Sequence, residues 1–175
     1  MYGVPSQQLH PDLSEQAGRI WVLALTSLAS FMAALDALVV TTALSTIRVS
    51  LHAPIEALEW TVNAYNLSFA VLLMTGAALG DRFGRRRMLV AGLALFVAGS
   101  AACAMAGSVA WLIAARAVQG AGAALVMPLA MALLGAAYPG QARAKALGIC
   151  SGVTGLALFV GPAAGGALAE GLAWQ

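Results

Sequence analysis

The sequence predicts an all-α integral membrane protein, a helical bundle that crosses the bilayer five times, and three observations lead to that fold class. Hydrophobic residues make up 61% of the 175 positions and charged residues only 9%, whereas soluble domains carry about 25% charged residues. The mean hydropathy of +0.87 agrees with a surface that faces lipid. A helix needs about 20 apolar residues to cross the hydrocarbon core, and five such stretches follow one another, at about residues 20–47, 58–79, 88–106, 109–137 and 146–168.

The polar connections between these stretches predict the domain organisation and the orientation. Residues 1–19 are polar and rich in turn formers, so we expect a cytoplasmic N-terminal tail, followed by a partial transmembrane bundle over residues 20–175. Lys and Arg accumulate in cytoplasmic loops. Of the nine Lys and Arg residues, Arg48 falls on the opposite side, Arg116 lies inside the fourth stretch, and the others share the side of the N-terminus. We therefore expect a multi-pass protein of the cell membrane with its N-terminus inside.

Two charged residues, Asp36 and Arg116, lie inside the predicted spans. Each costs at least ~2.5–3.5 kcal/mol at the bilayer centre on insertion scales. From the helical rise, Asp36 lies roughly 16 Å and Arg116 roughly 10 Å from the outer ends of their spans, a difference that a long Arg side chain can bridge. We expect the two to meet, either as a static ion pair or as a carboxyl whose protonation depends on solvation and on the guanidinium. The second reading is favoured, because a buried pair is an expensive way to obtain stability alone.

Neutral polar side chains form a second group within the spans. Asn63 and Asn66 are three residues apart and share a face of the second stretch, as Arg116 and Gln119 do on the fourth. Thr41 lies in the first stretch. These side chains either form interhelical hydrogen bonds or contact water and substrate in a central cavity.

Glycines recur at spacings that let helices approach closely. Gly76, Gly80 and Gly84 are four residues apart, which is a small-residue packing pattern. The fifth stretch contains Gly161-Pro162-Ala163-Ala164-Gly165-Gly166, in which the proline removes a backbone hydrogen bond and bends the helix. This run predicts either a helix that flexes or seals against a neighbour, or an ordinary kinked packing helix.

The connection between the second and third stretches, residues 80–87, combines glycine with charge. Its glycines permit a tight turn and its arginines keep it in the cytoplasm. Asp81, alone among four arginines, is not explained by the positive-inside effect, so we expect it to cap a helix N-terminus or to pair with a nearby Arg. A purely topogenic loop is the alternative.

Other function classes lack support in the sequence. No basic face exists outside the short loops, so we expect no nucleic-acid partner. Cys103 and Cys150 lie in apolar runs, as buried structural thiols do, and no metal-ligand spacing is present. His10 and His52 lie outside the spans without a partnered nucleophile, so we expect neither a metal site nor an enzyme.

Four of these segments resemble motifs of the major facilitator superfamily. Residues 76–87 resemble its signature loop, G-x-L-A-D-R-x-G-R-R, with Ala77 in place of the first glycine. Residues 116–122 resemble the fourth-helix motif R-x-x-Q-G-x-G, and residues 161–166 resemble the fifth-helix motif associated with antiporters. Residues 35–45 resemble the first-helix motif of the drug:proton antiporters, particularly the 14-span group. There the chain departs from the pattern at three positions, Leu38, Thr41 and Ser45.

The resemblance implies that the five spans form most of the N-terminal six-helix half of the family's fold, in a bacterial inner membrane. It implies proton-coupled export, by antiport and alternating access, of small organic compounds or drugs, as in multidrug resistance. The proton gradient would drive this transport without a cofactor. Alternatives that stay open are an exporter of one endogenous metabolite and a non-transporting membrane adaptor.

The resemblance also assigns roles to residues of this chain. Proton coupling would fall to Asp36 and Arg116. Conformational switching would fall to Gly80, Asp81, Arg82, Gly84, Arg85 and Arg86. The fourth-span motif comprises Arg116, Gln119, Gly120 and Gly122, and the antiporter motif comprises Gly161, Pro162, Gly165 and Gly166. The candidates for the substrate cavity are Thr41, Asn63, Asn66 and Gln119.

The number of spans leads to one further expectation. Family members have twelve or fourteen spans and transport by rocking one half against the other. We therefore expect this chain to be an N-terminal fragment whose essential partner is the missing C-terminal remainder of the same transporter.

Overall fold

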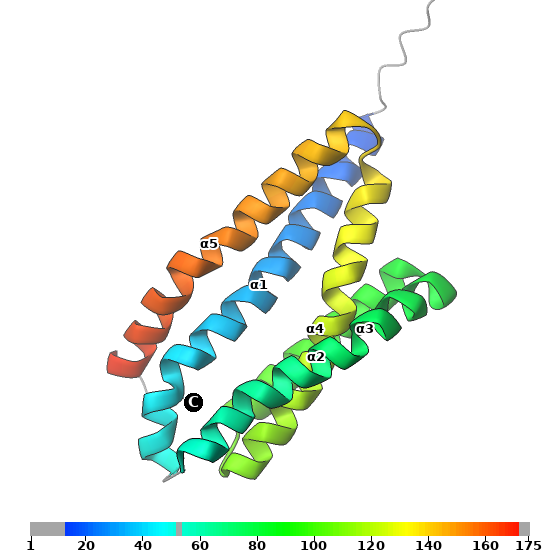
Figure 1. Cartoon of the computed structure of the whole chain (residues 1–175). Helices are drawn as coiled ribbons and strands as arrows, with labels where there is room; N and C mark the ends of the chain where they lie inside the picture. The colour runs from blue at the N-terminus through cyan, green and yellow to red at the C-terminus, as the bar shows by residue number, and fades with distance from the viewer. Residues whose placement is uncertain (1–12, 52–53, 172–175) are drawn as a thin grey trace, which may run out of the picture.

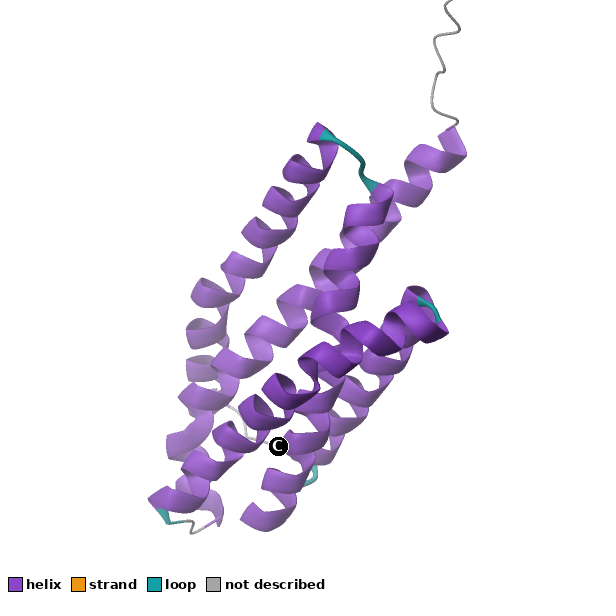
Figure 2. Cartoon of the chain, turned by 45° about the vertical axis from the view of Figure 1, so that its right-hand side comes forward, coloured by secondary structure: helices purple, strands orange, loops and turns teal. Residues whose placement is uncertain are grey.

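The computed structural model describes residues 13–51 and 54–171, and its elements within these ranges are α-helices joined by short loops, as Figure 2 shows. The helices are α1 (Leu13–Leu51), α2 (Ile55–Phe83), α3 (Arg85–Ala104), α4 (Val109–Ala137) and α5 (Gln141–Gly171). Each contains a stretch long and apolar enough to cross a membrane. The all-α class and the five membrane-length helices are therefore confirmed.

Three helices, α1, α2 and α5, extend at both ends beyond the apolar stretches that predicted them, whereas α4 matches its stretch and α3 begins earlier and ends earlier than expected. α1 begins at Leu13, inside the segment expected to be a tail, and α5 begins at Gln141, several residues before the expected span. Gln, Glu, Lys and Arg are good helix formers, so backbone hydrogen bonding continues past the last apolar residue. The rest of the expected tail, residues 1–12, and the end of the expected bundle, residues 172–175, lie outside the described ranges.

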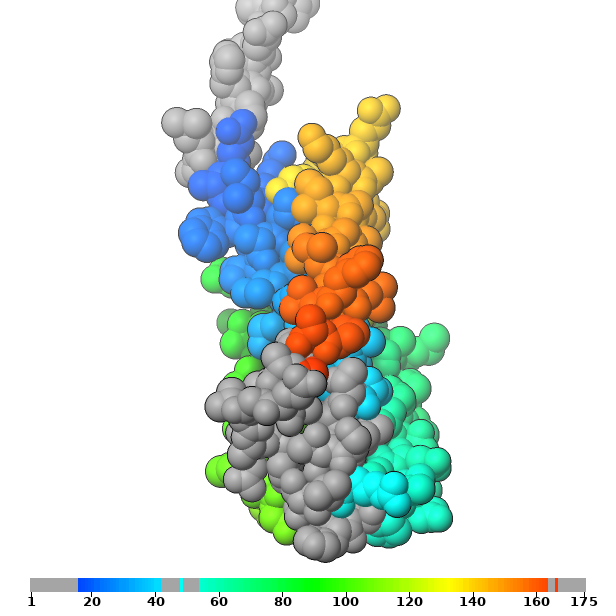
Figure 3. Space-filling model, turned by 90° about the vertical axis from the view of Figure 1, so that its left-hand side faces the viewer, coloured from blue at the N-terminus to red at the C-terminus, as the bar shows by residue number. Residues whose placement is uncertain are grey.

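The helix α4 occupies the centre of the bundle. It packs extensively against α2 and α3, and more lightly against α1 and α5. The helix α5 lies along α1, as Figures 1 and 3 show from two sides. The bundle thus consists of a pair, α1 with α5, and a group of three, α2 with α3 and α4, and the polar residues discussed below lie where the pair meets the group.

Glycines allow α4 to approach its neighbours at backbone distance. A Cβ added to Gly120 would overlap the carbonyl oxygen of Tyr65 on α2, and one added to Gly122 would lie 2.6 Å from a backbone nitrogen of α3. A Cβ added to Gly76 on α2 would lie 2.5 Å from the carbonyl oxygen of Ala124. Because backbone atoms cannot rotate away, a larger residue at these positions would push the helices apart.

Alanines make much of the contact between α1 and α4. Ala29 and Ala33 on α1 are buried in clusters with Ala130 and Ala123 on α4. Residues three or four apart share a face of a helix, so Asp36, three residues after Ala33, faces α4 as well. The small side chains bring the two helices close enough for polar groups to bridge them.

Candidate functional site

Three polar side chains join α1 to α4 inside the bundle. Arg116 donates from Nη1 to Asp36 Oδ2 at 2.6 Å and to Gln119 Oε1 at 2.7 Å. Gln119 donates from Nε2 to Asp36 Oδ1 at 2.7 Å. Each carboxylate oxygen of Asp36 is therefore bound by a different side chain of α4. We refer to Asp36, Arg116 and Gln119 as the polar triad, and its geometry confirms the expected meeting of the two charged residues.

Burial makes the triad electrostatically strong. The Arg116 side chain is 2% exposed and that of Asp36 is 17% exposed. Opposite charges attract strongly in such surroundings, but each ion has given up several kcal/mol of hydration, so removing one partner leaves the other as a costly lone charge. Asp36 is the more exposed of the two and is the group that water reaches more easily.

An aromatic ring lies on another side of the arginine. The Cζ atom of Arg116 is 4.2 Å from the centroid of the Tyr65 ring on α2, which is a cation–π contact. Tyr65 is buried and stacks on Phe69 with parallel rings. Tyr65 was not among the predicted site residues. Its position between Asn63 and Asn66 was the available signal, but an aromatic residue within an apolar stretch does not reveal which helix it faces.

The thiol of Cys103 on α3 extends the triad. It donates to Gln119 Oε1 over 3.6 Å, which is a weak hydrogen bond. A Cβ added to Gly99, one turn earlier on α3, would lie 2.8 Å from the Gln119 Cβ, so α3 packs directly against this residue. Cys150 is fully buried as expected, whereas Cys103 is only partly buried and has a polar partner.

The other predicted cavity residues do not join the triad. Asn63 and Asn66 are exposed on α2, and neither side chain forms a hydrogen bond to another residue that the structure describes. Thr41 is exposed and its hydroxyl donates to the Leu38 carbonyl of its own helix at 2.7 Å. Among the helices that the structure describes, these three residues therefore make no interhelical hydrogen bond, and their contact with water or substrate in a cavity stays a prediction. Of the candidates, Gln119 does bind across helices.

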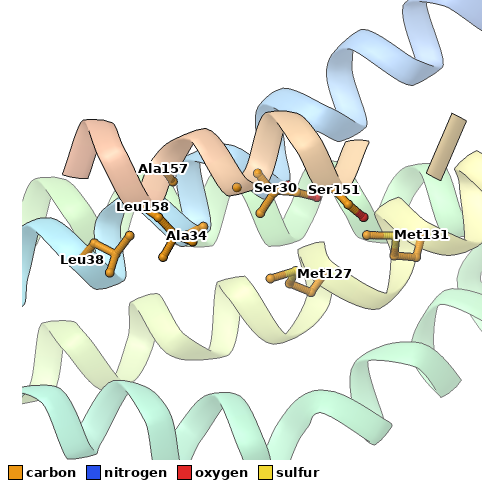
Figure 4. A pocket seen from close by; sticks show the side chains of 10 residues that line it. Ser30, Ala34, Leu38, Met127, Met131, Ser151, Ala157 and Leu158 are labelled. Atoms are coloured by element: carbon orange, nitrogen blue, oxygen red, sulfur yellow. The ribbon is translucent and has the colours of Figure 1, made fainter. Parts of the chain in front are cut away.

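A cavity of about 350 Å³ lies between α1, α4 and α5 (Figure 4). Its wall is mainly apolar and includes Met127 and Met131 from α4 and Leu158 from α5. Ser30 on α1 also lines it, and the Ser30 hydroxyl oxygen is buried without a hydrogen-bond partner in the described part of the chain. An apolar wall with a few polar groups is typical of sites for small organic molecules. Residues of α1 on both sides of Asp36 line the cavity, so it lies at a similar depth in the bundle.

The connection predicted at residues 80–87 is mostly helical, and the turn between α2 and α3 consists of one residue. The helix α2 ends at Phe83 and α3 begins at Arg85. Gly84 between them has a φ of 99°, a backbone conformation that glycine adopts readily and other residues rarely do. The expected tight turn at a glycine is therefore confirmed, but it is shorter than predicted, because only Gly84 has to leave the helical conformation and its charged neighbours are compatible with a helix.

Asp81 and Arg85 form a second ion pair across this break. Arg85 donates from Nε and Nη2 to Asp81 Oδ1 at 3.0 and 2.8 Å. Both side chains are largely exposed, 64% for Asp81 and 43% for Arg85. The expected pairing with a nearby Arg is confirmed, and the alternative of an N-cap is not, because Gly84 occupies the N-cap position of α3.

The remaining residues at this junction differ in their surroundings. Gly80 is buried where α2 meets Leu129 on α4, and an added Cβ would overlap that side chain. Arg82 and Arg86 are exposed, and the Arg82 guanidinium lies 5.4 Å from the centroid of the neighbouring Phe83 ring. At this junction, Gly80 is therefore packed against α4, whereas the arginines form a positively charged surface.

In α5, the glycine–proline segment touches α1 beside the triad. A Cβ added to Gly161 would lie 2.7 Å from the Cβ of Leu38, two residues from Asp36. Pro162 lies within the helix and is exposed, and Gly166 has open space around its Cα. The surroundings of Gly165 lie outside the described part. Within that part, Gly161 is the residue of this segment that permits a close approach between helices.

A family model for the Major Facilitator Superfamily matches residues 26–175. The chain belongs to the major facilitator superfamily. The match includes the polar triad, the α2–α3 junction and the glycine–proline segment of α5. Together with the five membrane-length helices, family membership makes the chain part of a multi-pass membrane protein.

Curated members of this superfamily that resemble the chain are named for resistance and export. The chain is 38% identical over 172 residues to the tetracenomycin C resistance and export protein of Streptomyces glaucescens, covering 98% of this chain and 32% of that protein. It is 40% identical over 158 residues to the multidrug resistance protein Stp of Mycobacterium tuberculosis, covering 90% and 29%. It is 40% identical over 157 residues to the methylenomycin A resistance protein of Bacillus subtilis, covering 89% and 34%. The chain spans about a third of the length of these relatives.

Proposed function

We propose that the protein to which these helices belong exports small organic compounds in exchange for protons, by alternating access. The observation that carries the proposal is the polar triad, in which a partly water-accessible carboxyl pairs with a buried guanidinium between two helices. Relatives whose names state drug resistance or export support the substrate class and the direction of transport.

Protonation of Asp36 gives the triad two states with different interactions. With Asp36 ionised, its charge and that of Arg116 sum to zero. Once Asp36 accepts a proton the ion pair is lost, and Arg116 remains as a lone cation in a buried position. Because such a charge is costly, protonation weakens the link between α1 and α4 and favours other packings of these helices. A ligand that shifts a conformational equilibrium must interact differently with its two states, and the proton does so here.

The cavity between α1, α4 and α5 supports an organic substrate. Its methionine side chains are flexible and polarisable, which suits a site that accepts ligands of several shapes. The close contact of Gly161 with Leu38 couples α5 to α1 near Asp36. A substrate between these helices and a proton on Asp36 therefore act on the same helix.

The rest of the machinery is part of the proposal as well. The remainder of a full-length transporter supplies the second half against which these helices rock. The arginines at the α2–α3 junction support the proposal that this end of the bundle, and with it the N-terminus, faces the cytoplasm of a bacterial cell. The exposed Asp81–Arg85 pair lies at the end that must open and close. The proton gradient drives the cycle without a bound cofactor.

The test uses the full-length protein in inverted membrane vesicles, with ethidium as a fluorescent organic probe. Wild-type vesicles are expected to accumulate ethidium when a proton gradient is imposed and to stop when a protonophore collapses it. Asp36→Asn should abolish gradient-driven accumulation while the amount of protein in the membrane stays unchanged. Glu56→Gln, which neutralises an exposed carboxyl in the first turn of α2, is the matched control and should transport normally.

A second variant separates folding from coupling. Asp36→Asn with Arg116→Gln removes both charges, so no lone cation is left in the bundle. This variant should insert as well as the wild type and still lack gradient-driven transport. Unchanged gradient-driven transport in either variant, or wild-type transport that ignores the protonophore, contradicts the proposed function.

A further inference from the structure

Two partners of different kinds hold Arg116. The first is the carboxylate of Asp36, 2.6 Å from Nη1. The second is the ring of Tyr65, whose centroid lies 4.2 Å from Cζ. The face of an aromatic ring carries a partial negative charge that attracts a cation, more strongly where water is excluded. The charge–charge attraction to the carboxylate disappears when Asp36 takes up a proton, whereas the attraction to the ring does not depend on that proton.

Arg116 has few other partners once Asp36 is neutral. Among the residues that the structure describes, Asp36 is the only carboxylate within ion-pair distance of Arg116. The Nε atom of Arg116 is buried and has no hydrogen-bond partner within the same residues. Gln119 Oε1 still accepts a hydrogen bond from Nη1, but it also accepts the one from Cys103. The ring of Tyr65 and the amide oxygen of Gln119 are therefore the two described partners that hold the cation independently of the proton.

Tyr65 is itself firmly placed. Its side chain is buried with Ala33, Phe96 and Ala123, which come from three different helices. Its ring stacks on Phe69. A ring packed on several sides keeps its position when a neighbouring charge changes, which a flexible partner would not do.

The fourth-span motif explains how the ring comes to lie there. Gly120 lies one turn beyond Arg116 on α4 and packs against the backbone of Tyr65, where no Cβ fits. Close approach at Gly120 brings the Tyr65 side chain over the arginine. The motif thus supplies the cation, Arg116, and also the glycine, Gly120, that lets α2 bring Tyr65 close to it.

We propose that Tyr65 is a positioning residue that keeps Arg116 beside Asp36 after Asp36 has taken up a proton, so that the ion pair re-forms when the proton leaves. This inference rests on the proposed function, since it requires Asp36 to exchange protons during transport. The ionisable groups around Asp36 come from each neighbouring helix: Arg116 from α4, Tyr65 from α2 and, through Gln119, Cys103 from α3. On α5 the described basic residues lie near its start at Gln141, far along the helix from the triad.

The proposal predicts a defect that depends on pH. At alkaline pH the ion pair holds Arg116, so weakening the ring's attraction should change transport little. Lower pH favours the state in which Asp36 carries a proton and Arg116 depends on partners other than a carboxylate, so the same change should then slow gradient-driven transport by on the order of tenfold. A purely structural role for Tyr65 would lower transport equally at every pH.

The experiment replaces Tyr65 in the full-length protein by leucine, by phenylalanine, and by mono-, di- and trifluorophenylalanine. Fluorine withdraws electron density from the face of the ring while nearly preserving its shape. Gradient-driven ethidium transport in inverted vesicles is measured for each variant from acidic to alkaline pH, with the amount of membrane protein as a normaliser. The same fluorinated residues at Phe69, which stacks on Tyr65, serve as the matched control, because the cation–π contact of Arg116 is with Tyr65.

The expected result is near-normal transport for Tyr65→Phe and a progressive loss at acidic pH as fluorines are added, with no such trend at Phe69. Fluorinated variants that match Tyr65→Phe at every pH overturn the inference, and so does a Tyr65→Phe variant as defective as Tyr65→Leu. The proposed function fails separately, if wild-type transport continues when a protonophore removes the gradient. If wild-type transport needs the gradient but added fluorines have no effect at any pH, only the role of Tyr65 is contradicted, and the proposed function stands.

Discussion

Asp36–Arg116 and Asp81–Arg85 are the same pair of chemical groups in two environments. Their closest nitrogen–oxygen distances are similar, 2.6 and 2.8 Å. The first pair joins two helices across 80 positions of the chain, and its arginine is 2% exposed. The second lies within four positions, and its arginine is 43% exposed. The comparison shows that distance does not determine what an ion pair does, and that burial does.

The two pairs suit different tasks for this reason. An exposed pair contributes about 0–1 kcal/mol and is screened by salt, so it breaks and re-forms at little cost. A buried pair contributes little net stability, yet removing one partner costs about 3–5 kcal/mol. The Asp81–Arg85 pair can therefore break at little cost, whereas removing either charge of the buried Asp36–Arg116 pair is costly.

The largest effect is expected from Asp36→Ala. It leaves Arg116 buried without a counterion and should destabilise the full-length protein by about 3–5 kcal/mol. Asp81→Ala, which removes the same group from the exposed pair, is the comparison variant and should cost less than about 1 kcal/mol. Thermal unfolding of both variants in detergent measures the difference, and equal losses would show that burial does not separate the two pairs.

An intermediate effect is expected from Gly120→Ala, because this glycine sets the spacing on which the buried pair depends. The new Cβ meets the carbonyl oxygen of Tyr65, which cannot rotate away, and overpacking of this kind costs about 1–3 kcal/mol. Gly148→Ala on α5, where an added Cβ meets nothing within 4 Å, is the control and should be neutral or slightly stabilising. Equal unfolding temperatures for the two variants would mean that α2 and α4 tolerate a wider spacing.

The smallest effect on stability is expected from Asp81→Asn. It should change the free energy of unfolding by no more than about 1 kcal/mol, and added salt should reduce even that difference. Under the proposed function the rate of ethidium transport should nevertheless fall, because the pair spans the break at Gly84 where the bundle opens. Unfolding and transport are measured on the same preparation. A large loss of stability would show that the exposed pair matters as much to folding as the buried pair of the triad does.

The contact between Asp36 and Arg116 could be predicted from the sequence because the depth of a residue in the membrane follows directly from its position along the helix. The rise per residue placed both groups at compatible depths, and the cost of burying a charge gave each a reason to find a partner. The same reasoning could not decide the faces of Asn63 and Asn66, which are exposed although they share a face. It could not find Tyr65 or Cys103, because apolar periodicity does not say which of several neighbouring helices a side chain meets.

The sequence alone therefore determined the number of membrane-length helices, the family motifs and the pairing of the two intramembrane charges. These follow from apolar length, from residue spacing and from the energy of charge in a low-dielectric medium. The tertiary structure decided the central position of α4, the one-residue break at Gly84 and the placement of an aromatic ring over Arg116. The position of α4 and of the ring depends on backbone contacts at Gly99, Gly120 and Gly122, where helices distant in sequence approach closely, and the break depends on the backbone conformation of Gly84.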